Sequence, residues 1–317
     1  MNYRTRTQLG GHGRDGGGRE PVKSPPFAYL RPRTVGEAVT LLVANAGTAK
    51  ILAGGQSLVP LMHRRLVRPR ALIDVIRLPD LRHLTKDGDG LRVGALTRHR
   101  DVEVSSDPWV TGSFGILPAA ATWIGSHPIR TRGTFGGSLV HADPGSEWCL
   151  LAVLLDAEIV VTGPDRTRVI AAADFFLGPH RTAMSWDELL VEVRFPSPAL
   201  HAALQEFAAR PGDPAVVTAA AAVELTDGRV SSARVAVGGG ASPPVRVPEA
   251  EDILLGAVPT GAACAAAGAR VATAVGALHA VAGDGDGYRR ELARSLTARA
   301  VAQAAASALG NGHREEA

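Results

Sequence analysis

Two glycine-rich segments constrain the fold of this chain more than any other feature. Each has a small or apolar lead-in, a Gly-Gly pair and then a polar residue: Ala53-Gly54-Gly55-Gln56-Ser57 and Thr134-Phe135-Gly136-Gly137-Ser138. Paired glycines permit positive φ and let the main chain approach a ligand closely. Successive N–H groups in such a loop can hold an anion such as pyrophosphate. Donors from two loops can neutralise a diphosphate from both sides, so the pattern predicts a dinucleotide site.

Neither segment matches the common nucleotide-binding fingerprints. The dinucleotide motif G-x-G-x-x-G and the P-loop motif G-x-x-x-x-G-K-[ST] are both absent from the two segments. Neither contains a lysine that could reach a terminal phosphate. Kinase and ATPase chemistry is therefore disfavoured.

Cysteine usage limits which metal centres this chain can carry. Its two cysteines, Cys149 and Cys264, are far apart in the sequence. A [2Fe–2S] cluster usually needs four cysteines, and a tetrahedral zinc site needs four grouped ligands. No metal site is expected in this chain, and both cysteines are expected to be small buried hydrophobic residues.

The pattern of the chain predicts two folded domains between two tails. Residues 1–24 form a glycine-rich tail that is expected to be disordered, because it has nothing to bury. The first domain is expected at 25–199, the second at 200–310, and a short tail at 311–317. Pro196 and Pro198 mark the boundary, after which alanine and valine dominate. Strands followed by helices in each half indicate an α+β fold.

Hydrophobic periodicity and turn signals place the main elements. Helices are expected at 35–46, 57–66, 118–124 and 147–155, and the alanine-rich stretch 261–309 is expected to be mostly helical. Strands are expected at 49–53, 71–75, 91–96, 158–161 and 189–195, with a hairpin of 216–225 and 230–237 around the Asp227-Gly228 turn.

Charge and hydropathy exclude several classes of partner. The net charge of +3 is small for 317 residues, aromatic residues are only 4%, and no basic stripe with interleaved aromatics occurs, so no nucleic-acid binding is expected. No apolar run approaches the ~20 residues of a membrane span. No apolar stretch follows Arg4 and Arg6, so a secretory signal is not expected. A cytoplasmic location is therefore expected.

Several longer motifs, in order along the chain, are more specific than either glycine pair. They are A-G-G-Q-S at 53–57, G-A-L-T at 94–97, I-R-T-R-G-T-F-G-G-S-L-V-H-A-D-P at 129–144, D-E-L-L-V-E-V-R-F-P at 187–196 and R-P-G-D-P-A at 210–215. Together they resemble the FAD subunit of molybdenum hydroxylases. That family includes the medium subunit of aerobic carbon monoxide dehydrogenase and the flavin domain of xanthine dehydrogenase. The likeness runs from about Phe27 into the C-terminal region.

The resemblance implies a fold and a division of labour. The fold is expected to be a vanillyl-alcohol-oxidase-like (PCMH-type) FAD-binding domain in two α/β subdomains, followed by a C-terminal α+β domain of the carbon monoxide dehydrogenase flavoprotein type. FAD is the cofactor expected here. The molybdenum cofactor is expected on a large partner subunit and the [2Fe–2S] clusters on a small iron–sulfur subunit, in a dimer of heterotrimers. Electrons would pass through the clusters to FAD and then to an external acceptor, and no residue of this chain would be catalytic.

The resemblance also implies which residues contact FAD. The pyrophosphate is expected on Ala53, Gly54, Gly55, Gln56 and Ser57 and on Thr134, Phe135, Gly136, Gly137 and Ser138, with Ile51, Leu52 and Leu58 flanking the first loop. Ile124 and Leu190 match positions that line the cofactor, and Glu147 matches an acidic position on the adenosine side. Asp143 and Asp213 are expected near the flavin.

Three positions depart from the family pattern. Ser138 replaces the usual Asn, and Gln56 stands where some relatives have His. Pro214 stands where an aromatic or aliphatic side chain often approaches the isoalloxazine.

Two other functions compete with the electron-transfer subunit. A stand-alone flavin-dependent oxidoreductase of related fold would need polar groups to orient its own substrate at the flavin. The sequence shows no obvious catalytic Tyr, Arg or His set of that kind. A regulatory or scaffold protein with a degenerate nucleotide site is the other alternative, and two intact glycine segments argue against it.

Overall fold

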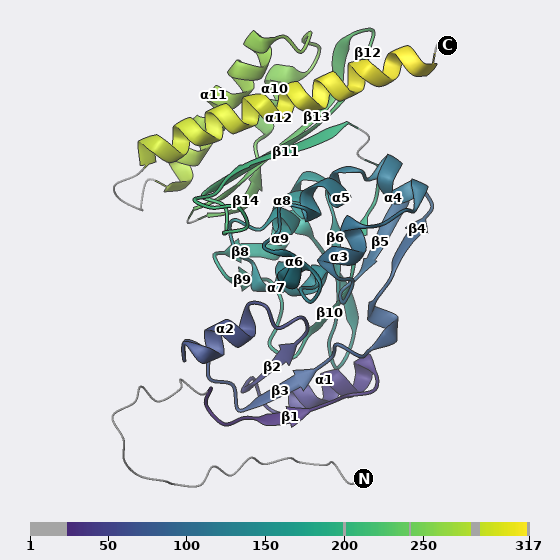
Figure 1. Ribbon diagram of the computed structural model, residues 1–317, viewed down its shortest axis with the longest axis vertical. Helices are drawn as coiled ribbons and strands as arrows, with labels where there is room; N and C mark the ends of the chain where they lie inside the picture. The colour runs from purple at the N-terminus through teal and green to yellow at the C-terminus, as the bar shows by residue number, and fades with distance from the viewer. Residues whose placement is uncertain (1–23, 199–200, 241, 280–285, 316–317) are drawn as a thin grey trace.

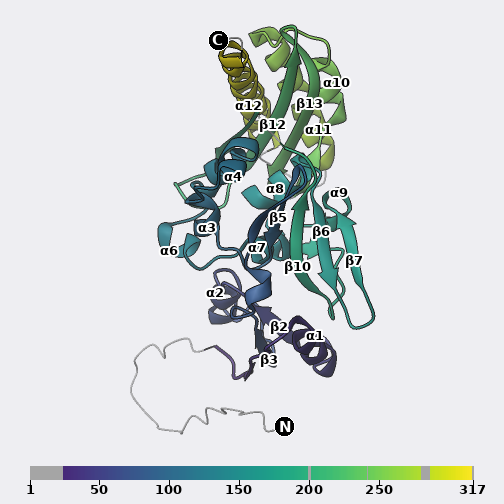
Figure 2. The same ribbon diagram turned by 90° about the vertical axis from the view of Figure 1, so that its right-hand side faces the viewer.

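The computed structural model describes residues 24–198, 201–240, 242–279 and 286–315. The predicted N-terminal tail lies outside these residues except for Ser24. Figures 1 and 2 show three layers stacked along the long axis of the molecule. No helix in the described part of the chain is both long enough and apolar enough to cross a membrane.

The N-terminal layer is a small parallel sheet with two helices. Its strands are β1 (Ala28–Leu30), β2 (Ala49–Leu52) and β3 (Ala71–Asp74), in the order β1-β3-β2. Helix α1 (Val35–Ala44) begins at Thr34, whose hydroxyl accepts a hydrogen bond from the Glu37 N–H, while the Glu37 carboxylate accepts one from the N–H of Arg33. Helix α2 (Leu58–His63) directly follows the first glycine loop. Because β2 runs straight into that loop, the sheet sets the loop's position.

The middle layer is an antiparallel sheet of five strands covered by short helices. The strand order is β4 (Leu84–Asp87), β5 (Gly90–Gly94), β10 (Leu189–Phe195), β6 (Glu158–Thr162) and β7 (Thr167–Ala171). The helical segments are η1 (Pro79–Leu81), α3 (His99–Glu103), α4 (Pro108–Ser113), α5 (Ile116–Ala121), α6 (His127–Arg130), α7 (Phe135–His141), α8 (Glu147–Leu154) and α9 (Ala172–Phe175). A short hairpin of β8 (Phe176–Gly178) and β9 (Arg181–Thr182) follows α9.

The C-terminal layer is an antiparallel sheet with helices on one face. Its strands, in order, are β11 (Ala202–Phe207), β12 (Val217–Thr226), β13 (Arg229–Gly239) and β14 (Ser242–Arg246). Helices α10 (Pro248–Leu254), α11 (Gly261–His279) and α12 (Asp286–Glu315) complete it, with α12 lying across the sheet in Figure 1.

Strand β12 explains why the sequence turns to alanine and valine after residue 216. Successive side chains of a strand point to opposite faces of the sheet. Ala220 and Ala222 pack into the core of the middle layer, whereas Ala219, Ala221 and Val223 pack against the C-terminal helices. Both faces are buried here, so residues 219–223 are all apolar instead of alternating with polar residues.

Helix α8 is buried on all sides for a related reason. Every residue from 148 to 154 is buried. The helix shares the core of the middle layer and contacts β12, β13 and β14 of the C-terminal layer. It therefore joins the two layers.

The structure confirms the α+β class and most of the predicted elements. The predicted helix at 118–124 lies earlier, as α5, and α12 continues past residue 310, where the sequence predicts a tail. The hairpin of β12 and β13 turns at Asp227-Gly228, with both residues at positive φ, as expected. One prediction is wrong: the second glycine pair lies inside helix α7 instead of a loop.

Candidate functional site

The first glycine segment is an open loop with free donors. It leaves β2 at Leu52, and Gly55 adopts a φ of +74°, where a side chain is strained. No hydrogen bond within the described part of the chain reaches the backbone N–H groups of residues 54–58. The Gln56 amide folds back and donates to the Gly54 carbonyl at 3.1 Å. Consecutive unpaired donors at a turn before a helix can bind an anion.

In the second glycine segment the backbone N–H groups of residues 135–138 are all hydrogen-bonded, which corrects the expectation of two equivalent loops. Thr134 caps α7, and its hydroxyl accepts from the Gly137 N–H at 3.2 Å. The N–H groups of Phe135, Gly136 and Ser138 donate to the carbonyls of Thr97, Ala95 and Thr134. A capping threonine and tertiary contacts thus outweigh the low helix propensity of two glycines.

The glycines of α7 serve close packing instead. A Cβ on Gly136 would lie 2.8 Å from the Cβ of Ala95, and one on Gly137 would lie 2.6 Å from the Thr134 hydroxyl oxygen. The Phe135 side chain is fully buried and stacks on Trp148 with ring centroids 4.6 Å apart. Phe135 therefore belongs to the core, whereas Ser138 remains half-buried, with its hydroxyl 3.1 Å from that of Ser146.

The two glycine segments meet across a main-chain contact. A Cβ on Gly54 would lie 2.3 Å from the carbonyl oxygen of Arg132 and 2.8 Å from the Cα of Gly133. A Cβ on Gly137 would lie 3.9 Å from that of Ala53. The structure thus brings together the two segments that the sequence predicts to act together.

A cavity of about 400 Å³ opens beside the first loop. Its lining comprises Leu52, Ala53, Gly54, Gly55, Gln56, Val59, Pro60, His63, Asp74, Ile76 and Arg132. The volume is in the range of small-molecule sites. Five of these residues, Leu52 to Gln56, were predicted; Ile51, Ser57 and Leu58 adjoin them as half-buried neighbours.

Sequence reasoning missed Arg132. It is exposed at the cavity, next to Gly133, which contacts the first loop. Within the described residues its guanidinium has no hydrogen-bond or ion-pair partner. An unpaired arginine beside free N–H donors is suited to a phosphate group. Its place in the quoted 129–144 motif was visible, but its position opposite residues 53–56 was not.

A group of carboxylates lies where α8 meets the C-terminal layer. Burial, with the neighbouring carboxylates of Glu206 and Asp143, raises the pKa of Glu147 to about 8. Burial also raises the pKa of Glu206 to about 7, and its Oε2 atom is buried without a partner in the described structure. Thr218, which pairs with Glu206 across β11 and β12, also has a buried, unpartnered hydroxyl. Glu206 was not predicted, because only the fold brings it near Glu147.

The remaining predicted residues are dispersed. Ile124 and Leu190 are buried in the core of the middle layer. Asp143 lies in the turn after α7, where its Oδ1 accepts from the Gly145 N–H at 2.9 Å. Asp213 is exposed in a loop whose Gly212 packs against Gly125. None of these four lines the cavity beside the first loop.

A buried histidine packs against Gly133, directly before the second segment. His99 accepts a hydrogen bond at Nδ1 from the Trp148 indole N–H at 2.9 Å. Its backbone N–H donates to the Gly133 carbonyl, and a Cβ on Gly133 would lie 2.5 Å from its Nε2. Burial, with the nearby Arg130, lowers the pKa of His99 to about 4. The ring is therefore neutral at pH 7.

Comparison with known families identifies both halves of the chain. Residues 25–198 match the family described as the FAD binding domain in molybdopterin dehydrogenase. Residues 202–304 match the carbon monoxide dehydrogenase flavoprotein C-terminal domain.

Individual relatives agree over nearly their whole length. The nicotine 6-hydroxylase medium subunit of Paenarthrobacter nicotinovorans is 35% identical over 288 residues, which are 90% of this chain and 99% of the relative. The carbon monoxide dehydrogenase medium chain of Hydrogenophaga pseudoflava is 34% identical, covering 87% of this chain and 96% of the relative. Among solved structures, quinoline 2-oxidoreductase from Pseudomonas putida 86 superimposes with a TM-score of 0.82 at 33% identity, covering 90% of this chain and 99% of that one.

The buried His99–Trp148 pair generates a prediction for acid stability. In the unfolded chain His99 has a pKa near 6.5, whereas in the folded chain its pKa is about 4. The stability that neutral His99 contributes is thus fully present above pH 6.5 and is lost as the pH falls from about 6.5 to about 4. His99→Gln keeps an acceptor for Trp148 but cannot titrate. Urea denaturation between pH 7 and 4 should show wild type losing up to about 3 kcal/mol more than the variant. Equal acid slopes would contradict the assignment.

Proposed function

Because the chain belongs to the FAD-binding medium subunits of the molybdenum hydroxylase family, we propose that it holds the FAD pyrophosphate at its first glycine loop. The observation that carries this proposal is the set of free N–H donors at residues 54–58, with the unpaired Arg132 facing the same cavity. Two phosphate charges need donors and a cation, and both are present there.

The other predicted contacts fit FAD in different ways. Gly54 and Gly137 leave room where a Cβ would fill the junction of the two segments. Ser138 offers a half-buried hydroxyl next to it. Glu147 and Glu206 lie close together, and the buried Oε2 atom of Glu206 has no hydrogen-bond partner in the described structure. A hydroxyl or amino group of the adenosine half of FAD could donate a hydrogen bond to it. The remaining predicted residues, Ile51, Leu58, Ile124, Asp143, Leu190 and Asp213, stay predictions as FAD contacts.

The chain is an oxidoreductase subunit, and its cofactor supplies the redox chemistry while the protein binds and orients it. We infer that it accepts electrons from an iron–sulfur subunit that is itself reduced by a molybdenum-containing large subunit. The names of the relatives, which are medium subunits and medium chains, support this assembly. Assembly as a dimer of heterotrimers and a cytoplasmic location remain predictions.

The first test is FAD binding by a loop variant with a matched control. Gly55→Ala places a methyl group 3.2 Å from Leu52 Cδ1 at a φ of +74°, so the loop must shift and its donors lose alignment. Gly228→Ala introduces the same backbone strain at a φ of +72° in an open hairpin turn. Both should lose about 1 kcal/mol of stability. Only Gly55→Ala should weaken FAD binding, by at least about tenfold, measured by flavin absorption and fluorescence titration; equal retention by both variants would count against the site.

Arg132 gives a second test. Arg132→Ala should weaken FAD binding by about tenfold, or about 1.4 kcal/mol, because one charge-assisted contact is lost. Arg132→Lys should recover part of the affinity. Because Arg132 is exposed and has no partner in the described structure, the melting temperature should not change. An unchanged dissociation constant in Arg132→Ala would remove this residue from the site.

A third prediction separates the subunit from a stand-alone oxidoreductase. The isolated, FAD-loaded chain should not hydroxylate the compounds after which its relatives are named, such as nicotine or quinoline. It should co-purify with large and small subunits when these are co-expressed. Turnover by the chain alone would favour the stand-alone alternative.

A further inference from the structure

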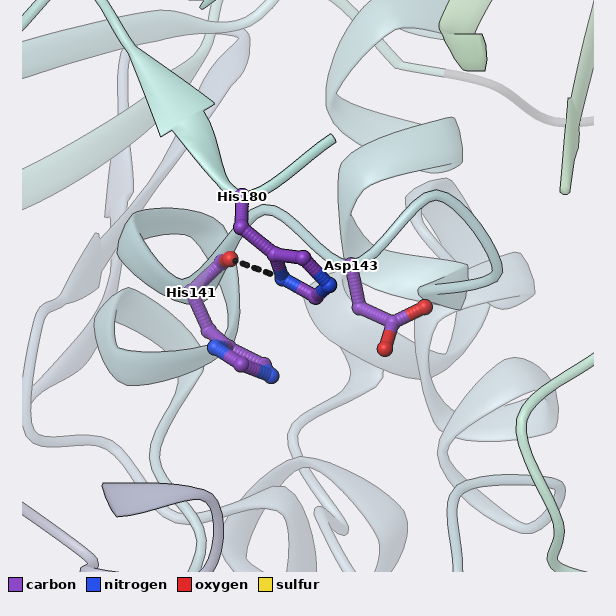
Figure 3. Close-up of side chains that lie close together, drawn as sticks. All are labelled: His141, Asp143 and His180. Atoms are coloured by element: carbon purple, nitrogen blue, oxygen red, sulfur yellow. Dashed lines mark hydrogen bonds between the residues drawn. The ribbon is translucent and has the colours of Figure 1, made fainter. Parts of the chain in front are cut away.

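Three metal-ligating side chains converge beside the end of α7. His141 is the last residue of α7, Asp143 lies in the following turn, and His180 lies in the turn between β8 and β9. One ligand atom from each lies within 4.8 Å of the other two. Figure 3 shows the two imidazole rings and the carboxylate pointing toward a common space.

The backbone holds His180 against the other two residues. Its N–H donates to the Ala142 carbonyl at 2.9 Å, and its Nδ1 lies 3.1 Å from the His141 carbonyl oxygen, the contact that Figure 3 marks. An Nδ1–H donated to a carbonyl leaves the Nε2 lone pair free for a metal ion. This is the usual arrangement of a ligating histidine and its supporting acceptor.

Two left-handed backbone positions occur within this cluster. Ala142 has a φ of +49° and His180 has a φ of +55°, and neither is glycine. Non-glycine residues in this region carry strain that the surrounding structure must offset. One of these positions directly precedes Asp143 and the other is His180 itself, and Asp143 is also held by the hydrogen bond that its Oδ1 accepts from the Gly145 N–H.

From this geometry we propose that His141, Asp143 and His180 form a binding site for one divalent transition-metal ion of the Zn²⁺ class. Two imidazoles and one carboxylate are a common ligand set for Zn²⁺, with water completing the coordination. At metal–ligand distances of about 2.0–2.2 Å, ligand atoms on one ion lie roughly 3.3 Å apart. Since the three atoms lie within 4.8 Å of one another, they need to approach by at most about 1.5 Å to reach this spacing.

The bound ion would connect two segments that are distant in sequence. It would link the β8–β9 hairpin to the end of α7, the helix that contains the second glycine pair. The sequence offered no sign of this site, because His180 is brought to the other two ligands only by the fold. The proposal does not depend on FAD, although Asp143 is also expected near the flavin.

The experiment measures Zn²⁺ binding to the full chain without an affinity tag. After chelator treatment and dialysis, the chain is titrated with Zn²⁺ by calorimetry, and bound metal is counted by mass spectrometry. We expect one ion per chain and a higher melting temperature with Zn²⁺. His180→Ala and Asp143→Asn should each weaken binding by about 100-fold or more, since losing a ligand should cost at least as much as losing a second-shell partner.

A histidine outside the cluster provides the control. His127 is exposed at the start of α6, so His127→Ala should bind Zn²⁺ like wild type. Substitution with Co²⁺ should give visible absorption bands that His180→Ala lacks. FAD content is measured by absorption on the same samples, so loss of metal and loss of flavin are separate results. Absence of stoichiometric binding, or equal binding by wild type and His180→Ala, would overturn the proposal.

Discussion

The main-chain contact between Gly54 and the Arg132–Gly133 peptide is the constraint on which the rest of the site depends. A Cβ on Gly54 would lie 2.3 Å from the carbonyl oxygen of Arg132, so no other residue fits without moving one segment. This contact joins the N-terminal layer to the middle layer. It also brings the free donors of residues 54–58 next to the Arg132 guanidinium. Anion binding and interlayer packing thus share one contact.

The same logic explains why glycines cluster in these motifs. Gly133 packs against His99, and Gly136 packs against Ala95, each at a distance that excludes a side chain. Only Gly55 among the paired glycines uses a positive φ. Glycine in this site therefore provides close approach at most positions and backbone freedom at one.

Local signals were sufficient for much of the fold. The Thr34–Glu37 cap, the Asp227-Gly228 turn and the apolar run of β12 all lead to the elements that the structure contains. The second glycine pair misled because paired glycines usually mark a loop. Thr134 carries the contrary signal, since a threonine before a short segment is a good helix cap. That this cap outweighs the two glycines follows only from the structure, in which the N–H groups of Phe135 and Gly136 also donate hydrogen bonds to distant carbonyls.

The site residues that the sequence missed share one property: long-range packing alone makes them relevant. Arg132 gains its role from facing the first loop, and Glu206 from lying near Glu147. No local spacing relates Glu206 to Glu147, since they lie on β11 and α8. Sequence resemblance transfers motif positions, but it does not show that Arg132 of one motif faces the first loop of another, nor that Glu206 lies near Glu147.

The buried carboxylates show that the C-terminal layer contributes to the site's electrostatics. Two carboxyl groups buried together are costly when both are charged, so at least one retains a proton near neutral pH. Burial is the main cause of the raised pKa of Glu147, to which the carboxylates of Glu206 and Asp143 add, and burial alone raises the pKa of Glu206. A protonated carboxyl donates as well as accepts, so it can pair with either a hydroxyl or a ring nitrogen of a ligand. Since Glu206 belongs to β11 and Glu147 to α8, this donor exists only while the C-terminal sheet is packed on α8.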